Sequence, residues 1–117
     1  MFASVVIPTY NRKPILEKCL LALEQQQLGG ALDRYEVVVV DDGSTDGTPD
    51  WLREHAARFP HVRLIEQEHG GPAAGRNRGV QQADGDVIVF IDSDLVVTDT
   101  FLASHARVLS QHWQTHG

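Results

Sequence analysis

The sequence predicts an α/β domain with a doubly wound, mostly parallel sheet between two layers of helices, a three-layer α/β/α arrangement. Short apolar runs with the composition of buried strands alternate along the chain with segments of helical spacing. Residues 37–40 are four valines, apolar on both faces, as in a central strand of a parallel sheet. The chain shows no internal repeat, low-complexity tract or linker, so residues 1–117 are expected to form one domain.

The first strand is predicted at residues 5–7, a β-branched run that ends at Pro8. A helix is then expected to begin at Pro14, because a proline at the first helical position lacks only an N–H that would have no helical partner. Gly29 and Gly30 are expected to end this helix. Five apolar residues at helical spacing predict its buried face: Ile15, Leu16, Cys19, Leu20 and Leu23.

A second helix is predicted after the valine strand, with Thr48 as its cap, Pro49 at its first position and Asp50 in its first turn. Pro60 should stop this helix, and the third strand follows at residues 62–65. The inner face of the helix is expected to consist of Leu52, Ala56 and Phe59.

A third helix is predicted from Pro72 to about Ala83, and Gly71, Gly75 and Gly79 recur every four residues along it. A glycine inside a helix costs up to about 1 kcal/mol relative to alanine. The spacing therefore indicates a helix backbone pressed against a neighbouring element or a ligand.

The fourth strand is predicted at residues 87–91, and Thr98 is expected to cap a last helix. The apolar face of that helix is expected to carry Phe101, Leu102, Leu109 and Trp113.

Composition and charge exclude some classes of protein. Hydrophobic residues make up 42% of the chain and charged residues 22%, as in ordinary globular domains. Acidic residues outnumber basic ones 16 to 10, which gives a net charge of −6. The sequence shows no stripe of basic residues of the kind that binds nucleic acid, so we do not expect a nucleic-acid partner. A phosphate ligand would therefore need a metal ion or well-placed arginines to offset the acidic excess.

The single cysteine, Cys19, allows no internal disulfide and favours a cytoplasmic location. The chain starts without the pattern of a signal peptide, and its longest apolar runs are far shorter than the roughly 20 residues of a membrane helix. We expect a soluble domain, within a parent protein that could itself be attached to a membrane.

Polar clusters follow three of the predicted strands. The carboxyl ends of parallel strands meet at one edge of the sheet, and open α/β sheets bind their ligands there. Carboxylates gathered at one place repel each other and usually persist because a cation or a hydrogen-bond donor joins them. The clusters are Thr9-Tyr10-Asn11, Asp41-Asp42-Gly43-Ser44 and Asp92-Ser93-Asp94.

Asp92 and Asp94 have the alternate spacing that puts two carboxylates on one side of an extended segment. Carboxylate oxygens suit Mg²⁺ or Mn²⁺, which complete their coordination with waters and substrate phosphates. The alternative is an ordinary turn, because Asp and Ser are common turn residues. The other two clusters at the same edge favour a metal site.

The 41–47 segment is either a plain polar loop or a site whose carboxylates accept hydrogen bonds from a base or a ribose. Arg76 and Arg78 lie near the start of the glycine-bearing helix, where the guanidinium fork and the helix N-terminus favour a diphosphate. The alternative for both arginines is a solvated helix face. The spacing of three histidines would put them near one face of the last helix, and we interpret this as chance rather than as a metal site: His105, His112 and His116. Cys19 is expected in the core.

Four motifs in order resemble the family 2 glycosyltransferases, inverting enzymes of the Rossmann-like GT-A fold. The likeness extends from about Ser4 to the end of the chain. The motifs are Ser4-Val5-Val6-Ile7-Pro8-Thr9-Tyr10-Asn11-Arg12, Val39-Val40-Asp41-Asp42-Gly43-Ser44-Thr45-Asp46, Gly75-Arg76-Asn77-Arg78-Gly79 and Phe90-Ile91-Asp92-Ser93-Asp94.

The resemblance implies a nucleoside-diphosphate sugar donor, typically a UDP sugar. It implies that Thr9 and Tyr10 line the base pocket and that Asp42 receives the base N–H, with Asp41 supporting the loop. Arg76 would lie near the base or diphosphate, Asp92 at the ribose, and Asp94 on a Mn²⁺ or Mg²⁺ ion that neutralises the leaving diphosphate. The complete set of predicted nucleotide-binding residues is Pro8, Thr9, Tyr10, Asn11, Asp41, Asp42, Arg76, Asp92 and Ser93, with Asp92 and Asp94 as metal ligands.

The chain departs from the family in two respects. Gly75 stands where alanine is more common, a mild difference. No residue after Asp99 is acidic, so the general base that inverting transfer requires is missing, and we expect a donor-binding part cut before the acceptor half. Such a part should transfer sugar poorly or not at all alone and should self-associate through an exposed apolar edge.

Two other functions are compatible with parts of this pattern. A non-catalytic nucleotide-binding or interaction module would have the same sequence features. A phospho-acceptor receiver domain would need an acidic pair after the first strand and a lone aspartate after the third, and the first strand here ends in Pro8-Thr9-Tyr10-Asn11. The sugar and the acceptor, whether polysaccharide, lipid carrier or protein, are not specified by these motifs.

Overall fold

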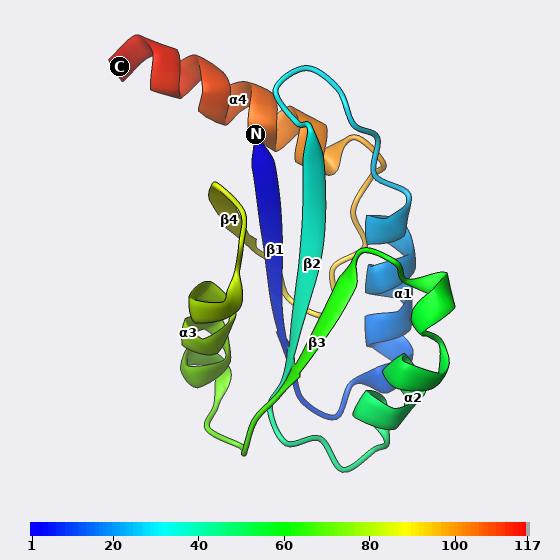
Figure 1. Ribbon diagram of the computed structural model, residues 1–117. Coiled ribbons are helices and arrows are strands. Elements are labelled where there is room, and N and C mark those ends of the chain that lie inside the picture. The colour runs from blue at the N-terminus through cyan, green and yellow to red at the C-terminus, as the bar shows by residue number, and fades with distance from the viewer. Residues whose placement is uncertain (117) are drawn as a thin grey trace.

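A computed structural model describes the backbone of residues 1–116 and the side chains of residues 1–109. Its sheet has four parallel strands in the order β3-β2-β1-β4 (Figure 1). The fold class predicted from the sequence is therefore confirmed, since the described strands form a parallel sheet with helices on both faces. The strands are β1 (Phe2–Thr9), β2 (Arg34–Asp41), β3 (Val62–Glu66) and β4 (Val87–Phe90).

The helices α1 (Lys13–Glu24) and α2 (Thr48–Glu54) cover one face of the sheet, and α3 (Pro72–Gln82) covers the other (Figure 1). A short 3-10 turn, η1 (Ala56–Arg58), follows α2, and α4 (Phe101–His116) crosses the sheet near the start of β1. The chain moves outward from β1 to β3 and then returns through α3 to β4 on the opposite side of β1. This reversal makes the carboxyl end of β1 the switch point of the sheet.

The two faces of the sheet bury cores of different size. On the side of α1 the strands pack against the buried helix residues Leu16, Leu20 and Leu23, with Leu102 of α4 in the same cluster. On the side of α3 the buried cluster consists of Val6, Val38 and Val40 alone. The difference arises because α3 places glycines rather than large side chains against the strands.

The glycines of α3 bring its backbone close to β1, as their spacing predicts. A Cβ at Gly75 would lie 2.9 Å from Cβ of Pro8, and a Cβ at Gly79 would overlap the side chain of Val6. Because protein cores are close-packed, there is no room for such an atom unless the strand moves. The close approach is thus confirmed for Gly75 and Gly79, both against β1, but not for Gly71, where a Cβ would meet no atom within 4 Å.

The first strand is longer than predicted, because it does not end at Pro8. Pro8 pairs in register with Val40, and Thr9 pairs with Asp41. Since β4 pairs with β1 only as far as Val6, Pro8 lies beyond the part of β1 that has a strand on both sides, where proline is tolerated. The extension places Thr9 at the sheet edge beside Asp41.

The C-terminal end of the first helix was predicted wrongly. Pro14 lies in its first turn, as expected, but α1 ends at Glu24 and not at Gly29-Gly30. The chain turns early because the buried side chain of Gln26 accepts a hydrogen bond from Leu102 N at 3.0 Å and donates one to Thr98 O at 2.6 Å. These bonds connect the end of α1 to the start of α4 and replace further helical turns.

The second helix begins with a different cap. Gly47 occupies the cap position with φ +85°, and Thr48 is the first helical residue. The carboxylate of Asp46 performs the capping, because its Oδ1 accepts a hydrogen bond from Thr48 N at 3.1 Å. Leu52 and Phe59 are buried as predicted, whereas the prediction for Ala56 is wrong, since the helix ends at Glu54 and leaves Ala56 exposed.

The last helix also differs from its prediction. It begins at Phe101 and not after Thr98, and Phe101 N donates to Thr98 O. Leu102 is buried as expected, but Leu109 is exposed, because the helix extends beyond the sheet that its first turns cover. Trp113, His112 and His116 lie outside the residues whose side chains are described.

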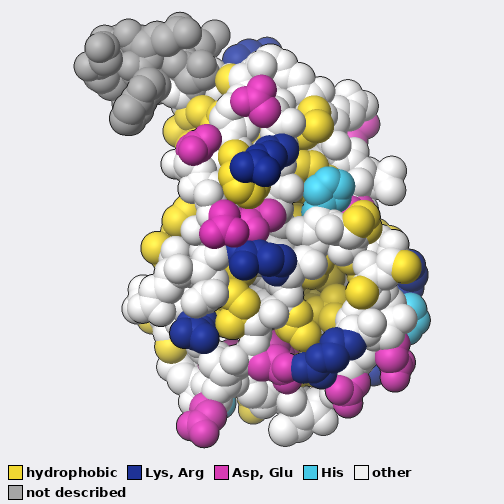
Figure 2. All heavy atoms as spheres, viewed as in Figure 1, with side chains coloured by type: hydrophobic (Ala, Val, Ile, Leu, Met, Phe, Trp, Pro, Cys, Tyr) yellow, Lys and Arg dark blue, Asp and Glu magenta, His cyan; other side chains and the backbone are white. Residues whose placement is uncertain are grey.

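A shallow apolar hollow of about 160 Å³ lies between α2 and β3, and Figure 2 shows it as an apolar patch on the face of β3. Arg53 forms ion pairs with Asp50 and Glu66 beside it. No helix in the described part of the chain combines the length and the hydropathy that crossing a membrane requires.

Candidate functional site

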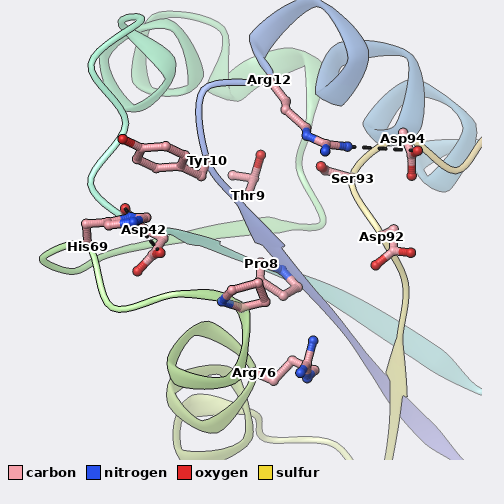
Figure 3. Close-up of a pocket in the computed structure, with 11 residues that line it drawn as sticks. Pro8, Thr9, Tyr10, Arg12, Asp42, His69, Arg76, Asp92, Ser93 and Asp94 are labelled. Atoms are coloured by element: carbon pink, nitrogen blue, oxygen red, sulfur yellow. Dashed lines mark hydrogen bonds and ion pairs between the residues drawn. The ribbon is translucent and has the colours of Figure 1, made fainter.

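A pocket of about 470 Å³ opens at the carboxyl ends of β1, β2 and β4, beside the start of α3 (Figure 3). Side chains from separate segments of the chain converge there because the strands are parallel and end at the same edge. Its lining consists of Pro8, Thr9, Tyr10, Arg12, Asp42, His69, Pro72, Arg76, Asp92, Ser93 and Asp94.

Asp42 is the most enclosed carboxylate of this lining, with a side chain only 5% exposed. Its Oδ1 accepts hydrogen bonds from Gln67 Nε2 and Gly70 N, both at 2.8 Å, and its Oδ2 accepts one from Gly71 N at 2.9 Å. Burial by itself raises the pKa of Asp42, but these three hydrogen bonds and the nearby His69 together lower it below its ordinary value. Asp42 is therefore held as an acceptor-only carboxylate.

Tyr10 and His69 stand together at the side of the pocket beside Asp42 (Figure 3). Their ring centroids are 4.3 Å apart, with the planes inclined by 37°. Nδ1 of His69 hydrogen-bonds to the backbone O of Asp42 at 3.1 Å and lies 3.0 Å from Asp42 Oδ2. The rings and the carboxylate form a small platform suited to a flat, hydrogen-bonding ligand.

Asp92 and Asp94 follow β4 on the opposite side of the pocket (Figure 3). Both are exposed, whereas Ser93 between them is buried. The segment is not extended as predicted but forms a turn, in which Leu95 N donates to Asp92 O at 3.1 Å, and both carboxylates still line the pocket. Cys19, buried in α1, lies under this segment, with Sγ 3.9 Å from Asp92 O. Burial and, to a lesser degree, the charge of Asp94 raise the pKa of Cys19 to about 12, in keeping with a core thiol.

The donor set at this segment suits a hard divalent cation. Asp92 and Asp94 offer two carboxylates beside open volume, and Mg²⁺ is usually held by one or two carboxylates together with substrate phosphates and waters. No group of three or more His, Cys, Asp or Glu ligands occurs among the described residues. The two carboxylates would leave the other coordination positions of such an ion to waters and to oxygens of a ligand.

Two cations face this acidic lining. Arg12, at the turn after β1, has Nη1 3.9 Å from Asp94 Oδ2. Arg76, in α3, lines the pocket below Pro8 (Figure 3). Arg78 is exposed on the same helix and does not belong to the lining. Of Arg76 and Arg78, only Arg76 was included in the predicted nucleotide-binding set, and only Arg76 lines the pocket.

Asn11 and Asp41 do not line the pocket but connect the loops that form it. Asn11 adopts φ +51°, and its Oδ1 accepts a hydrogen bond from Thr45 N at 2.7 Å. Asp41 is 2% exposed, and its Oδ2 accepts from Ser44 N at 3.0 Å. Asn11 thus holds the loop after β2 against the loop after β1, whereas Asp41 fixes the turn of the loop that directly follows it.

Two buried oxygens near this junction have no hydrogen-bond partner among the described residues, Thr9 Oγ1 and Asp41 Oδ1. Buried polar atoms are normally paired with protein or ordered water. Both residues occupy the ends of adjacent strands in register. Of these two residues, Thr9 lines the pocket and Asp41 does not.

Most of the residues predicted from the sequence meet in this pocket. Pro8, Thr9, Tyr10, Asp42, Arg76, Asp92, Ser93 and Asp94 all line it. Three further lining residues were not assigned a role from the sequence: Arg12, His69 and Pro72. Arg12 stands in the same motif as Tyr10, and His69 directly precedes the glycine pair after β3, so the position of each at a strand end was the available signal.

The structure thus defines an α/β domain with a carboxylate-lined pocket at the switch point of a parallel sheet. Residues 4–115 match the model of the glycosyl transferase family 2, and the chain belongs to that family. Membership confirms the resemblance drawn from the four motifs and leaves no ground for the receiver-domain alternative.

Related proteins agree with this assignment. The uncharacterized glycosyltransferase YfnE of Bacillus subtilis (strain 168) is 40% identical over 107 residues, which are 92% of this chain and 26% of YfnE. The crystal structure of residues 1–349 of TarS from S. aureus in complex with UDP-GlcNAc superposes with a TM-score of 0.81 at 32% identity, covering 96% of this chain and 32% of that chain.

The mannosyltransferase PcManGT from Pyrobaculum calidifontis, in complex with GDP-Man and Mn²⁺, superposes with a TM-score of 0.69 at 37% identity, covering 79% of this chain and 27% of that chain. The chain therefore spans about a quarter to a third of the length of each of these three relatives.

Proposed function

We propose that this domain binds a nucleoside-diphosphate sugar, most simply a UDP sugar, together with a divalent metal ion, for inverting transfer of the sugar to an acceptor. The observation that carries the proposal is the pocket itself. It brings Asp42 and Tyr10 to one side and Asp92 and Asp94 to the other, with Arg76 between them at the start of α3. Support comes also from the TarS complexes with UDP and UDP-GlcNAc.

The side of the pocket formed by Tyr10 and Asp42 would hold the base. An exposed aromatic ring gives a stacking surface for any base. The carboxylate of Asp42 accepts hydrogen bonds only, because its pKa is lowered and it is ionised at neutral pH. A base with an N–H on its pairing edge fits this arrangement, and uracil and guanine both have one.

The opposite side would hold the ribose and the diphosphate. Asp92 would accept hydrogen bonds from ribose hydroxyls, and Asp94 with Asp92 would hold Mn²⁺ or Mg²⁺, since both aspartates line the pocket. When bound, the ion neutralises charge on the diphosphate as it leaves. Arg12 and Arg76 would add donors to the same phosphate oxygens, since guanidinium groups bind phosphates with paired N–H donors.

Transfer also needs an acceptor and a general base. Residues 1–117 correspond to only about a quarter to a third of YfnE, of the TarS 1–349 chain and of PcManGT. We propose that residues 1–117 act as the donor-binding part of a longer enzyme whose other part supplies the base and the acceptor site. The alternative is a non-catalytic nucleotide-binding module, which would bind the same ligand in the same pocket without turnover in any context.

Exposed apolar residues support a contact with further protein at the β4 side. Phe90 is 49% and Val96 62% exposed, and Leu95 between them is exposed as well. In the isolated chain we propose that this surface causes self-association. Analytical ultracentrifugation over a range of concentrations tests this point, and a monomer at the highest concentration would contradict it.

Calorimetric titration of the chain with UDP, with and without Mn²⁺, tests the donor site. We expect binding that depends on Mn²⁺ and that an Asp94→Asn variant loses. The matched control is Asp99→Asn, an exposed aspartate of the following loop outside the pocket, which should bind as the original chain does. Absence of UDP and GDP binding under all conditions would contradict the proposal.

Turnover requires a second experiment. A longer version of the protein, extended to the length of its relatives, should hydrolyse or transfer a UDP sugar, and the Asp94→Asn change should abolish this activity. Binding without any turnover in the longer protein would favour the non-catalytic module instead.

A further inference from the structure

The acceptor positions of Asp42 are almost completely occupied by the protein itself. A carboxylate has about four lone-pair positions, two on each oxygen. Oδ1 uses both of its positions for Gln67 Nε2 and Gly70 N, and Oδ2 uses one for Gly71 N. Only one position on Oδ2 remains for a ligand.

That remaining position is covered by His69. Nδ1 of His69 hydrogen-bonds to the backbone O of Asp42 at 3.1 Å and also lies 3.0 Å from Oδ2, and its ring packs on Tyr10 at a centroid distance of 4.3 Å. The imidazole is a flat ring with a nitrogen beside the carboxylate of Asp42 and a face on Tyr10. These are the two contacts that the proposed function assigns to the nucleobase.

Among the groups that contact the carboxylate of Asp42, His69 is the one that can move away with the least change to the rest of the structure. Gly70 and Gly71 donate through backbone N–H groups at the start of α3, and Gln67 is half-buried. The side chain of His69 is 58% exposed, and among the described residues its ring hydrogen-bonds to Asp42 alone. A rotation about its side-chain torsions would free Oδ2 and the face of Tyr10 together.

We infer that His69 is a specificity-determining residue of the base site, because its imidazole competes with the nucleobase for Asp42 and Tyr10. This inference rests on the proposed function. A base must displace His69, and only a base that both stacks and donates an N–H to Asp42 recovers the contacts that are lost. The apparent affinity is reduced by the fraction of time for which His69 covers the site.

The test compares the binding of UDP and of inorganic pyrophosphate, both with Mn²⁺, to the original chain and to His69→Ala. We expect His69→Ala to bind UDP about threefold to tenfold more tightly, the range expected when a half-exposed polar contact beside a carboxylate no longer competes. Pyrophosphate has no base, so its affinity should not change. Calorimetry measures both values.

The matched control is His105→Ala, since His105 is another exposed histidine that packs on an aromatic ring, Phe101, at 4.5 Å, far from the pocket. It should leave both affinities unchanged. Thermal unfolding followed by circular dichroism verifies that His69→Ala folds, and His69→Phe provides a second variant that keeps the ring but frees Asp42, with an intermediate gain expected.

Three outcomes would overturn the inference. Equal or weaker UDP binding by His69→Ala would show that His69 does not compete with the base. An equal gain for pyrophosphate would show that the effect is one of charge alone. If UDP binds to none of these proteins, the proposed function fails as well, and this result is distinct from the first two, in which the original chain binds UDP.

Discussion

Nη1 of Arg12 lies 3.9 Å from Oδ2 of Asp94, so a protein cation stands beside the carboxylate proposed to hold the metal. Both side chains are about half exposed, at 52% and 57%. Exposed ion pairs of this kind contribute at most about 1 kcal/mol. A divalent ion that also binds the diphosphate can therefore displace Arg12 from Asp94, and Arg12 would be released toward the phosphates.

Substitutions of these two residues should therefore have different effects on the binding of Mn²⁺. In the presence of saturating UDP, Asp94→Asn should weaken Mn²⁺ binding by at least about tenfold, because one of two carboxylate ligands is lost. Arg12→Gln leaves both carboxylates in place, so it should not weaken the binding of Mn²⁺ while UDP is saturating. Electron paramagnetic resonance of free Mn²⁺ measures both. An equal loss in Arg12→Gln would mean that Arg12 is required to assemble the metal and diphosphate together.

The two arginines of α3 should differ in their effect on the nucleotide. Arg76 lines the pocket and Arg78 does not, although both are exposed and two residues apart. Arg76→Ala should lower the affinity for UDP by about tenfold, as expected for loss of a charged hydrogen bond to phosphate. Arg78→Ala is the matched control and should bind UDP normally. Calorimetry decides, and similar losses in both variants would indicate a general effect of charge.

Gly79 should not tolerate alanine. Alanine is favoured over glycine inside a helix by about 1 kcal/mol, but a Cβ here would overlap Val6 of the central strand. Overpacking of this kind costs about 1–3 kcal/mol, so Gly79→Ala should lower the free energy of unfolding despite the better helix former. The exposed Asn77→Ala in the same helix serves as control and should be neutral or stabilising. Urea denaturation measures the difference, and a stabilised Gly79→Ala would refute the close approach.

Glu36 should make stability depend on acid pH. Its buried carboxylate accepts hydrogen bonds from Ser4 Oγ at 2.6 Å, Asp84 N at 2.8 Å and Arg63 Nε at 2.9 Å. Burial raises the pKa of Glu36, but these bonds and the charge of Arg63 lower it below its ordinary value overall. The folded state thus favours the ionised form, and its stabilisation is present above the ordinary glutamate pKa of about 4.3 and lost as the pH falls below it.

At pH 7, Glu36→Gln should lower the free energy of unfolding by about 1–3 kcal/mol, the cost of leaving buried donors without their charged acceptor. Between about pH 5 and pH 3 the variant should lose less further stability than the original chain, because the linked protonation is absent. Glu54→Gln, at an exposed glutamate of α2, is the control. Parallel pH profiles for Glu36→Gln and the original chain would contradict the assignment.

Much of the fold follows from patterns that are local in the sequence. The four valines of β2, the prolines that start α1, α2 and α3, and the glycines of α3 each act within a few residues. The polar residues after the strands could be placed in one pocket because parallel strands end at the same edge. The location of Tyr10, Asp42 and Asp94 at this edge follows from the sequence in this way.

Side-chain partners from distant segments decided the rest. The helix α1 ends at Glu24 because Gln26 bonds to residues more than seventy positions away. Asn11 turned out to join two loops, and His69 to cover Asp42 across 27 residues of chain.

The sequence by itself therefore determined the family, the parallel sheet and the edge at which the pocket forms, since periodicity and strand ends are properties of the local chain. Only the tertiary structure decided which side chains of that edge line the pocket, which ones hold the loops in place, and that the imidazole of His69 lies against Asp42. Those choices depend on hydrogen bonds and packing between segments that meet only when the chain has folded.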